Sequence, residues 1–311
     1  MFIGCQLGSL FYLLMLKWKS MKDKKLIGSF MLLLAALLWG SAYGIQALMS
    51  KHVGDFTIIF CKSFSGFILI TYCLLKGRRL NKKSILAAIL IGVFNGAGLC
   101  LQQYALAKGN VSKVSFISGL YIIFVPILSI FLLKKKPKTR FWFAVAIACA
   151  GMYFLCLGES FKIEATDAIT LVSTIFFALQ IIYIHMYSKG IDTVAFCGVQ
   201  QVTTCLMCVP AMFLVDKTTL FDFKQILIPG LYVMLLPGMI AQVLQNTYQR
   251  DVDATVGTLI MSLESVFGAI SGVIFLDARL TPVEMAGCVL IFISIIIAEN
   301  ERGFKWIRKA K

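Results

Sequence analysis

The sequence predicts an all-α membrane protein with ten transmembrane helices, arranged as two inverted five-helix repeats. The first observation is composition: 59% of the 311 residues are hydrophobic and only 14% are charged, whereas soluble domains carry about 25% charged residues. The second is a mean hydropathy of +0.86. The third is length, because a spanning helix needs about 20 apolar residues. Ten such helices would leave no room for a sizeable soluble domain.

The predicted spans are separated by short polar or basic connections. Those at 141–158 and 282–299 are close to the lower length limit for crossing the hydrocarbon. In chain order the ten spans are expected at 26–49, 56–75, 84–106, 112–133, 141–158, 167–187, 193–215, 226–247, 254–276 and 282–299.

These spans define four segments of the chain. Residues 26–158 form the first predicted repeat and 159–300 the second, followed by a basic tail at 301–311. Residues 1–25 form an N-terminal extension whose apolar part is too short to span. Met21 opens a stretch typical of a natural start, so translation is expected to begin there; a short interfacial helix is the alternative.

Charge placement predicts the orientation. The net charge is +15, from 30 Lys and Arg against 15 Asp and Glu. Basic clusters lie at the ends of apolar stretches, which is the pattern of cytoplasmic loops, so both termini are expected in the cytoplasm. A nucleic-acid partner is excluded, because no aromatic residues interleave with these basic residues. Twenty of the bases are Lys17, Lys19, Lys22, Lys24, Lys25, Lys76, Arg78, Arg79, Lys82, Lys83, Lys134, Lys135, Lys136, Lys138, Arg140, Arg302, Lys305, Arg308, Lys309 and Lys311.

No motif predicts a metal, a cofactor or an enzyme. All ten cysteines fall in apolar runs, and Cys205-x-x-Cys208 lies inside a helix-length stretch without a second such pair or a nearby His. Zinc and redox sites need those partners. Phosphate-binding, metalloprotease and nucleophile-elbow motifs are missing from the sequence.

An internal repeat supports the two-half plan. Residues 101–134 align with 244–277 at an offset of 143, which pairs Gln102 with Gln245. An offset of 137 pairs Tyr43 with Gln180. Five spans per half is an odd number, so the halves must lie antiparallel. Inverted repeats are a common plan of secondary transporters, which bind substrate near the midplane where the repeats meet.

Ionisable residues inside spans are the strongest functional candidates, because charge is costly at the bilayer centre. Glu264 lies about ten residues from either end of its span, and Lys62 lies about two turns into the second span. Glu264 is expected to carry a coupling proton or to pair with a cation, and Lys62 to bind a substrate carboxylate or balance a helix end. The structural alternatives are that Glu264 is a neutral or hydrogen-bonded acid without a transport role, and that Lys62 extends to the outer membrane interface.

Amide and aromatic side chains within the spans complete the candidate substrate site. Such groups avoid lipid, so they either line a cavity or bridge helices. Pro126, Pro210 and Pro237 would break helices beside a cavity or only kink them. The polar candidates are Trp39, Tyr43, Gln46, Asn95, Gln102, Tyr121, Gln180, Tyr183, Gln242 and Gln245.

Several stretches resemble the EamA family of the drug/metabolite transporter superfamily. They are LLAALLWGSAYGI in the first span, QQYALAKGNVSKVSFISGLYIIFVPILSIFLLKKKP, FWFAVAIACAGMYFL and SLESVFGAISGVIFLDARLTPVEMAGCVLIFISI. The resemblance covers residue 26 to about 300. The chain departs from the family at Ser265, where Pro is frequent, at Asp277-Ala278 before Arg279, and at Lys62, where Arg is usual.

The resemblance implies ten helices in two inverted bundles, with spans 5 and 10 at the periphery. It also implies a plasma-membrane exporter of amino acids or related small metabolites that works by alternating access, as a monomer or weak homodimer in the lipid bilayer. Alternatives are a flippase for a lipid-linked substrate and a non-transporting membrane partner protein. A lateral opening to lipid would indicate the flippase. A stable stoichiometric complex without protein-dependent flux would indicate the partner protein.

Overall fold

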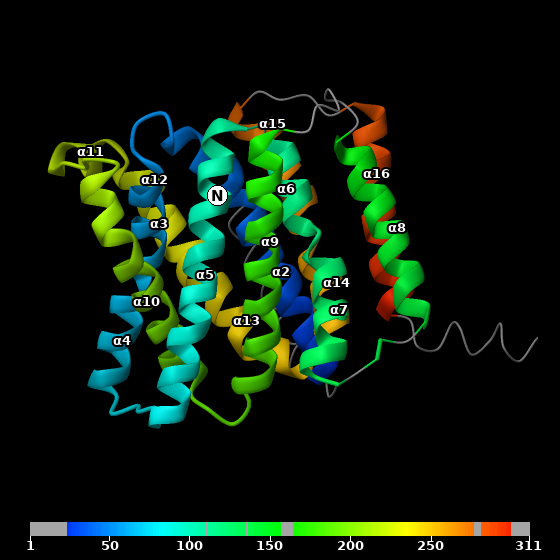
Figure 1. The fold of residues 1–311 in the computed structure, drawn as a ribbon, viewed down its shortest axis with the longest axis horizontal. Helices are drawn as coiled ribbons and strands as arrows, with labels where there is room; N and C mark the ends of the chain where they lie inside the picture. Colours follow the sequence, from blue (N-terminus) through cyan, green and yellow to red (C-terminus); the bar gives the residue numbers. More distant parts are fainter. Residues whose placement is uncertain are drawn as a thin grey trace, which may run out of the picture.

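The computed structural model describes residues 24–109, 111–134, 136–137, 139–156, 164–276 and 281–299, and its regular structure within these ranges is helical (Figure 1). The predicted N-terminal extension, except Lys24 and Lys25, and the tail at 301–311 lie outside the described residues, as do Asp277 and Arg279.

Eight helical segments of the described chain are long and apolar enough to cross a membrane. Two further apolar helices, Phe141–Phe154 and Pro282–Ile297, are shorter, so the number of ten crossings stays a prediction. In chain order the helices are α2 (Lys24–Met49), α3 (Asp55–Ser63), α4 (Ser65–Leu75), α5 (Lys82–Lys108), α6 (Val111–Gly119), α7 (Tyr121–Leu132), α8 (Thr139–Cys156), α9 (Ala165–Tyr187), α10 (Thr193–Leu214), α11 (Leu220–Gln225), α12 (Leu227–Val233), η1 (Met234–Ala241), α13 (Gln242–Tyr248), η2 (Gln249–Asp251), α14 (Ala254–Met261), α15 (Glu264–Leu276) and α16 (Pro282–Glu299).

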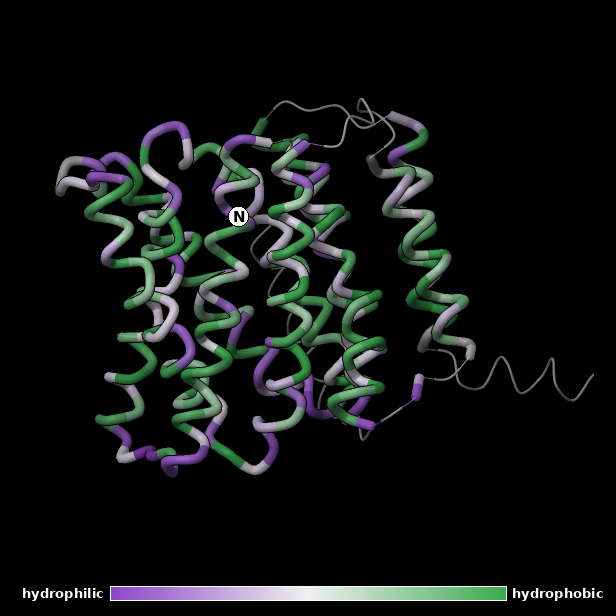
Figure 2. Tube along the Cα trace, in the orientation of Figure 1, coloured by the Kyte–Doolittle hydropathy of each residue, from purple (hydrophilic) through white to green (hydrophobic). Residues whose placement is uncertain are grey.

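The outer surface is apolar and the interior contains many polar side chains. Leu75 and Ile228 are more than four-fifths exposed, whereas Gln200 and Asn246 are fully buried. Figure 2 shows the hydrophobic residues running along the helices and the hydrophilic ones concentrated at their ends. A water-soluble fold has the opposite arrangement, so the chain is a multi-pass membrane protein that turns apolar side chains to lipid.

Helix contacts follow the pattern expected of two halves related by a pseudo-two-fold axis. The α2 helix packs on α15, and its counterpart α9 packs on α6 and α7. Likewise, α5 packs on α9, and the π-helical and α13 segments pack on α2. Two other contacts join helices that occupy equivalent places in the two halves. In one, α3 and α4 pack on α10. In the other, α8 packs on α16, and these two helices lie side by side at one end of the molecule (Figure 1).

Helix breaks occur at equivalent places in the two halves. One span breaks at Leu120, between α6 and α7, and another at Ser262 and Leu263, between α14 and α15. The offset of 143 that aligns the halves superimposes Leu120 on Leu263, and Tyr121 on Glu264. At both breaks the backbone forms 3₁₀-type hydrogen bonds to the residue three positions earlier: Leu120 N donates to Ile117 O, and Leu263 N donates to Ile260 O. Such tightened turns satisfy part of the backbone that the break frees.

A third interruption surrounds Lys62. The second span breaks at Phe64, and the π-helical segment η1 opposite contains Pro237. Pro237 explains this irregularity, because proline lacks the N–H of a regular helix. By contrast, Pro126 and Pro210 lie inside helices that continue past them.

Glycines bring the interrupted segments into contact. A Cβ added to Gly238 would overlap the Lys62 carbonyl oxygen, and one added to Gly40 would lie 2.7 Å from the Glu264 carbonyl oxygen. Gly44 follows one turn later and donates its N–H to Ser271 Oγ at 3.1 Å. Small residues at such spacing let helix backbones approach closely in membranes.

Candidate functional site

A cavity lies at the centre of the helices, where side chains from eight of the predicted spans converge; α8 and α16 do not contribute to it. Its volume of about 60 Å³ holds about four to six waters, at roughly 10–15 Å³ each. The cavity must therefore widen to take a metabolite. It is lined by Trp39, Tyr43, Gln46, Lys62, Asn95, Leu99, Gln102, Tyr121, Phe177, Gln180, Ile181, Gln201, Gln242, Gln245, Met261 and Glu264.

Helical periodicity explains how the sequence builds this lining. On α2 the lining residues are Trp39, Tyr43 and Gln46, which are four and three residues apart. The α5 helix repeats the spacing with Asn95, Leu99 and Gln102. Residues three and four apart share one face of a helix, so each helix presents one lining stripe to the cavity.

One basic and one acidic side chain lie in this cavity. Lys62 and Glu264 are each only 7% exposed. Within the described chain they form no direct ion pair at or below 4.0 Å. Each lies at a helix break: Lys62 two residues before Phe64, and Glu264 as the first residue of α15. The interrupted backbone therefore places both side chains in the same cavity.

Several lining amides are held by other side chains. Gln46 Nε2 donates to Gln103 Oε1 at 2.9 Å. Gln102 Nε2 donates to Tyr43 Oη at 3.0 Å and to Ser118 Oγ at 2.8 Å. These residues bridge α2, α5 and α6, so they support the cavity as well as line it.

Asn95 and Gln201 tie the two halves together. Asn95 Nδ2 donates to Gln201 Oε1 at 3.3 Å and to Thr204 Oγ1 at 3.2 Å. Gln201 Nε2 donates to Gly238 O at 2.6 Å, and Trp39 Nε1 donates to Pro237 O at 3.2 Å. The carbonyls released in the π-helical segment thus bind side chains of the cavity wall.

Other lining groups keep free hydrogen-bonding capacity. Gln242 Nε2 and Gln245 Oε1 are buried without a hydrogen-bond partner among the described residues, and the Tyr121 hydroxyl lies beside the Glu264 carboxyl group. Buried polar atoms are normally paired, directly or through water. These three atoms, together with Lys62 and Glu264, can therefore bind a polar ligand.

The structure brings together eleven of the twelve side chains that the sequence singles out. Tyr183 lies apart, since its ring packs on Phe94 at 5.4 Å and on Tyr187 at 5.9 Å between centroids. Its neighbour Gln180, one turn away, does line the cavity.

The lining also contains residues beyond these twelve. Leu99, Phe177, Ile181 and Met261 form apolar wall, and Gln201 adds an amide. Gln201 carries the same sequence signal as the twelve, because it is an amide inside the apolar stretch 193–215. The four apolar residues carry no such signal, because the sequence alone does not distinguish them from residues that face lipid.

Fold and cavity together define a polytopic helical membrane protein with a central polar site between two interlocked halves. The sequence model of the EamA-like transporter family matches residues 26–157 and again 165–299. The chain therefore belongs to the EamA-like transporter family.

One protein is similar to this chain in sequence and one solved structure is similar in fold. A protein of Archaeoglobus fulgidus described as an uncharacterized transporter is 27% identical over 275 residues, covering 88% of this chain and 86% of that protein. One solved crystal structure, described simply as that of a protein, superimposes with a TM-score of 0.71 at 15% identity, over 88% of this chain and 97% of that chain. At that identity the likeness concerns the fold.

Proposed function

We propose that this membrane transporter is a secondary active carrier that exports amino acids or related small metabolites across the plasma membrane by alternating access. The observation that carries the proposal is the cavity in which Lys62 and Glu264 are buried together. An amino acid carries one carboxylate and one ammonium group. Lys62 can bind the carboxylate and Glu264 the ammonium, each through a charge-assisted hydrogen bond.

The remaining lining supports a small amphipathic substrate. Gln242 and Gln245 offer polar atoms that have no hydrogen-bond partner within the described residues, the Tyr121 hydroxyl lies beside Glu264, and Phe177 and Met261 supply apolar wall. Binding sites for small molecules combine such apolar walls with a few placed polar groups. The proposed carrier acts as a monomer or weak homodimer, with both termini in the cytoplasm.

Glu264 has two possible roles, which differ in coupling. In the first, it binds a coupling proton when the substrate leaves. In the second, it balances the charge of Lys62 in the empty carrier and of the substrate ammonium in the loaded one. The second role keeps the net charge of the site at zero in both states, whereas the first leaves the empty site with the charge of the bound proton, which is costly in a low-dielectric interior.

Reconstitution with an unbiased metabolite pool tests the proposal. Liposomes containing the purified protein are incubated with the pool, with and without a proton gradient, and the trapped species are read by mass spectrometry. We expect one amino acid or close relative to accumulate only with protein, and the gradient dependence to select between the two roles. A folded preparation that accumulates none of the pool would contradict the proposal and favour the flippase or partner alternatives.

A further inference from the structure

Two polar contacts join the halves at opposite ends of the same helix. The α10 helix, Thr193–Leu214, has 22 residues and is therefore about 33 Å long. At its start, Asp192 forms an ion pair with Arg78, whose nitrogen Nη1 lies 3.4 Å from Oδ2. Just after its end, Asp216 accepts hydrogen bonds from Thr57. We call these the Asp192 latch and the Asp216 latch.

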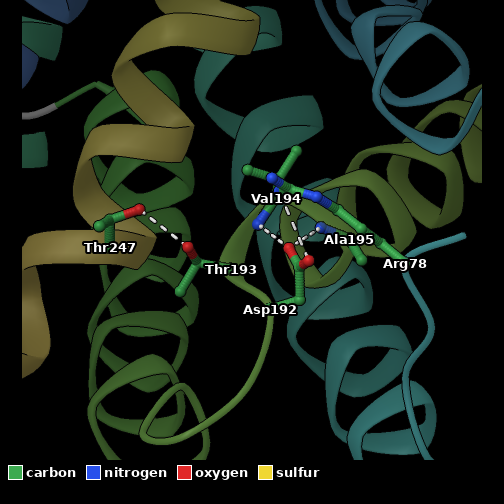
Figure 3. Close-up of polar contacts among 6 residues, drawn as sticks. All are labelled: Arg78, Asp192, Thr193, Val194, Ala195 and Thr247. Carbon is green, nitrogen blue, oxygen red and sulfur yellow. Dashed lines mark hydrogen bonds and ion pairs between the residues drawn. The ribbon is translucent and has the colours of Figure 1, made fainter. Parts of the chain in front are cut away.

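The Asp192 latch is drawn in Figure 3. One carboxylate oxygen of Asp192 accepts from the backbone N–H groups of Val194 and Ala195, at 3.0 and 3.1 Å, and the other faces the Arg78 guanidinium. Arg78 comes from the connection after α4, where its own N–H donates to Cys73 O at 2.9 Å. A loop of the first half thus holds the start of a helix of the second half.

The Asp216 latch is its counterpart with the halves exchanged. Asp216 Oδ2 accepts from Thr57 N at 2.7 Å and from Thr57 Oγ1 at 2.8 Å, and Thr218 also bonds to the Thr57 hydroxyl. Here a loop of the second half holds the start of α3 in the first half. An offset of 137 places Asp55, the first residue of α3, on Asp192.

Local packing makes room for the Asp216 latch. A Cβ added to Gly54 would overlap the Asp216 carboxyl group. Gly54 is the residue that precedes α3, so the carboxylate occupies the space where any other residue would place its side chain. The contact is therefore built into the sequence on both sides.

The two latches differ in strength. Thr57 is fully buried, and its two bonds to a carboxylate are short and charge-assisted. The Arg78 and Asp192 side chains are 39% and 23% exposed, and ion pairs open to solvent contribute little. The Asp192 latch should therefore open first.

Resting on the proposed function, we infer that Arg78, Asp192, Thr57 and Asp216 are gating residues, which lock the contact between α3–α4 and α10 at either face during alternating access. Both latches are closed in this structure, in keeping with its small cavity. Opening one latch should reinforce the other, because a carrier of this kind opens to one side at a time.

Hydrogen–deuterium exchange of the full protein in nanodiscs tests the gating role without a known substrate. We expect Asp216→Ala to speed exchange at the start of α3 and to slow it at residues 76–82 and the start of α10. The distant change should reach about 5-fold, the lower end of typical coupling. Arg78→Gln should do the reverse. If Asp216→Ala misfolds, Thr57→Val replaces it in this test, because it removes only the hydrogen bonds of the Thr57 hydroxyl to Asp216 and Thr218.

A matched control is available on the same chain. Asp222 accepts from Thr219 N at 2.7 Å and Thr219 Oγ1 at 2.8 Å, within its own turn. Asp222→Ala should change exchange only around α11. Local loosening without the reciprocal change, or the same reciprocal change in Asp222→Ala, would overturn the gating role. Reciprocal exchange in a protein that moves no amino acid would contradict the proposed substrate and leave the latches standing.

Discussion

At the scale of single residues, the cavity depends on two ionisable side chains in a place where charge is costly. Lys62 and Glu264 are buried among amides and aromatic rings contributed by eight of the predicted spans. Truncating either side chain to alanine would leave a void and buried polar groups without partners, which is destabilising. Polar substitutions of similar shape, rather than alanine, therefore separate function from folding.

Lys62→Gln should weaken substrate binding and leave the fold intact. A charge-assisted hydrogen bond contributes about 1.5–3 kcal/mol, so the apparent affinity should fall about 10- to 150-fold. The half-saturating concentration for the species found in the liposome screen measures this. Tyr183→Phe is the control, since Tyr183 lies outside the cavity. Unchanged affinity in Lys62→Gln would remove Lys62 from the site.

Gly40→Ala should destabilise the protein, because the new Cβ would lie 2.7 Å from Glu264 O and 2.9 Å from Gly268 N. Overpacking of this kind costs about 1–3 kcal/mol. Gly230→Ala is the matched control, since its Cβ would have Cys61 Sγ as its nearest neighbour, at 4.0 Å. Melting temperatures in detergent compare the two variants. Equal values would mean that α2 and α15 are not closely packed at Gly40.

At the scale of helices, the interruptions place the site. Pro237→Ala should allow the π-helical segment Met234–Ala241 to become a regular helix and rotate the residues beyond it. Gln242 and Gln245 would then turn away from the cavity, and transport should fall about 100-fold, a typical cost of misplacing a binding group by about 1 Å. Flux in liposomes measures the loss.

The matching variant for Pro237→Ala is Pro210→Ala, because Pro210 lies inside α10, which continues through it. We expect it to transport at close to the normal rate. Normal flux in Pro237→Ala would show that the π-helical geometry is not needed to position the two glutamines.

Sequence patterns predict the helices and most of the lining, for definite physical reasons. Polar residues in apolar spans avoid lipid, so the sequence alone predicts that Tyr43, Gln102 and Glu264 face the interior. The breaks at Leu120 and Leu263 carry no such signal, because neither glycine nor proline marks the break residue itself. Their positions come from tertiary packing. Tyr183 shares a helix face with Gln180, yet an aromatic neighbour on α5 holds it outside the cavity.

At the scale of the whole molecule, the halves are joined by contacts that must change during transport. Cys100 on α5 and Cys208 on α10 bring their sulfurs to 3.6 Å. Oxidation of membranes with copper–phenanthroline should form a disulfide between them and stop flux, because the halves can no longer move apart. Mass spectrometry of the linked peptides measures the bond, and Cys208→Ser is the control. Undiminished flux in fully cross-linked protein would contradict relative motion at this contact.

The most direct test of the account compares wild-type protein with Glu264→Gln in liposomes, using the species found in the screen. Gradient-driven accumulation and exchange without a gradient are measured on the same preparations. If Glu264 couples transport to protons, the variant should lose accumulation and keep exchange; if it balances charge, both should fall. Full gradient-driven transport by a folded Glu264→Gln variant would contradict the central claim that this buried carboxylate takes part in transport.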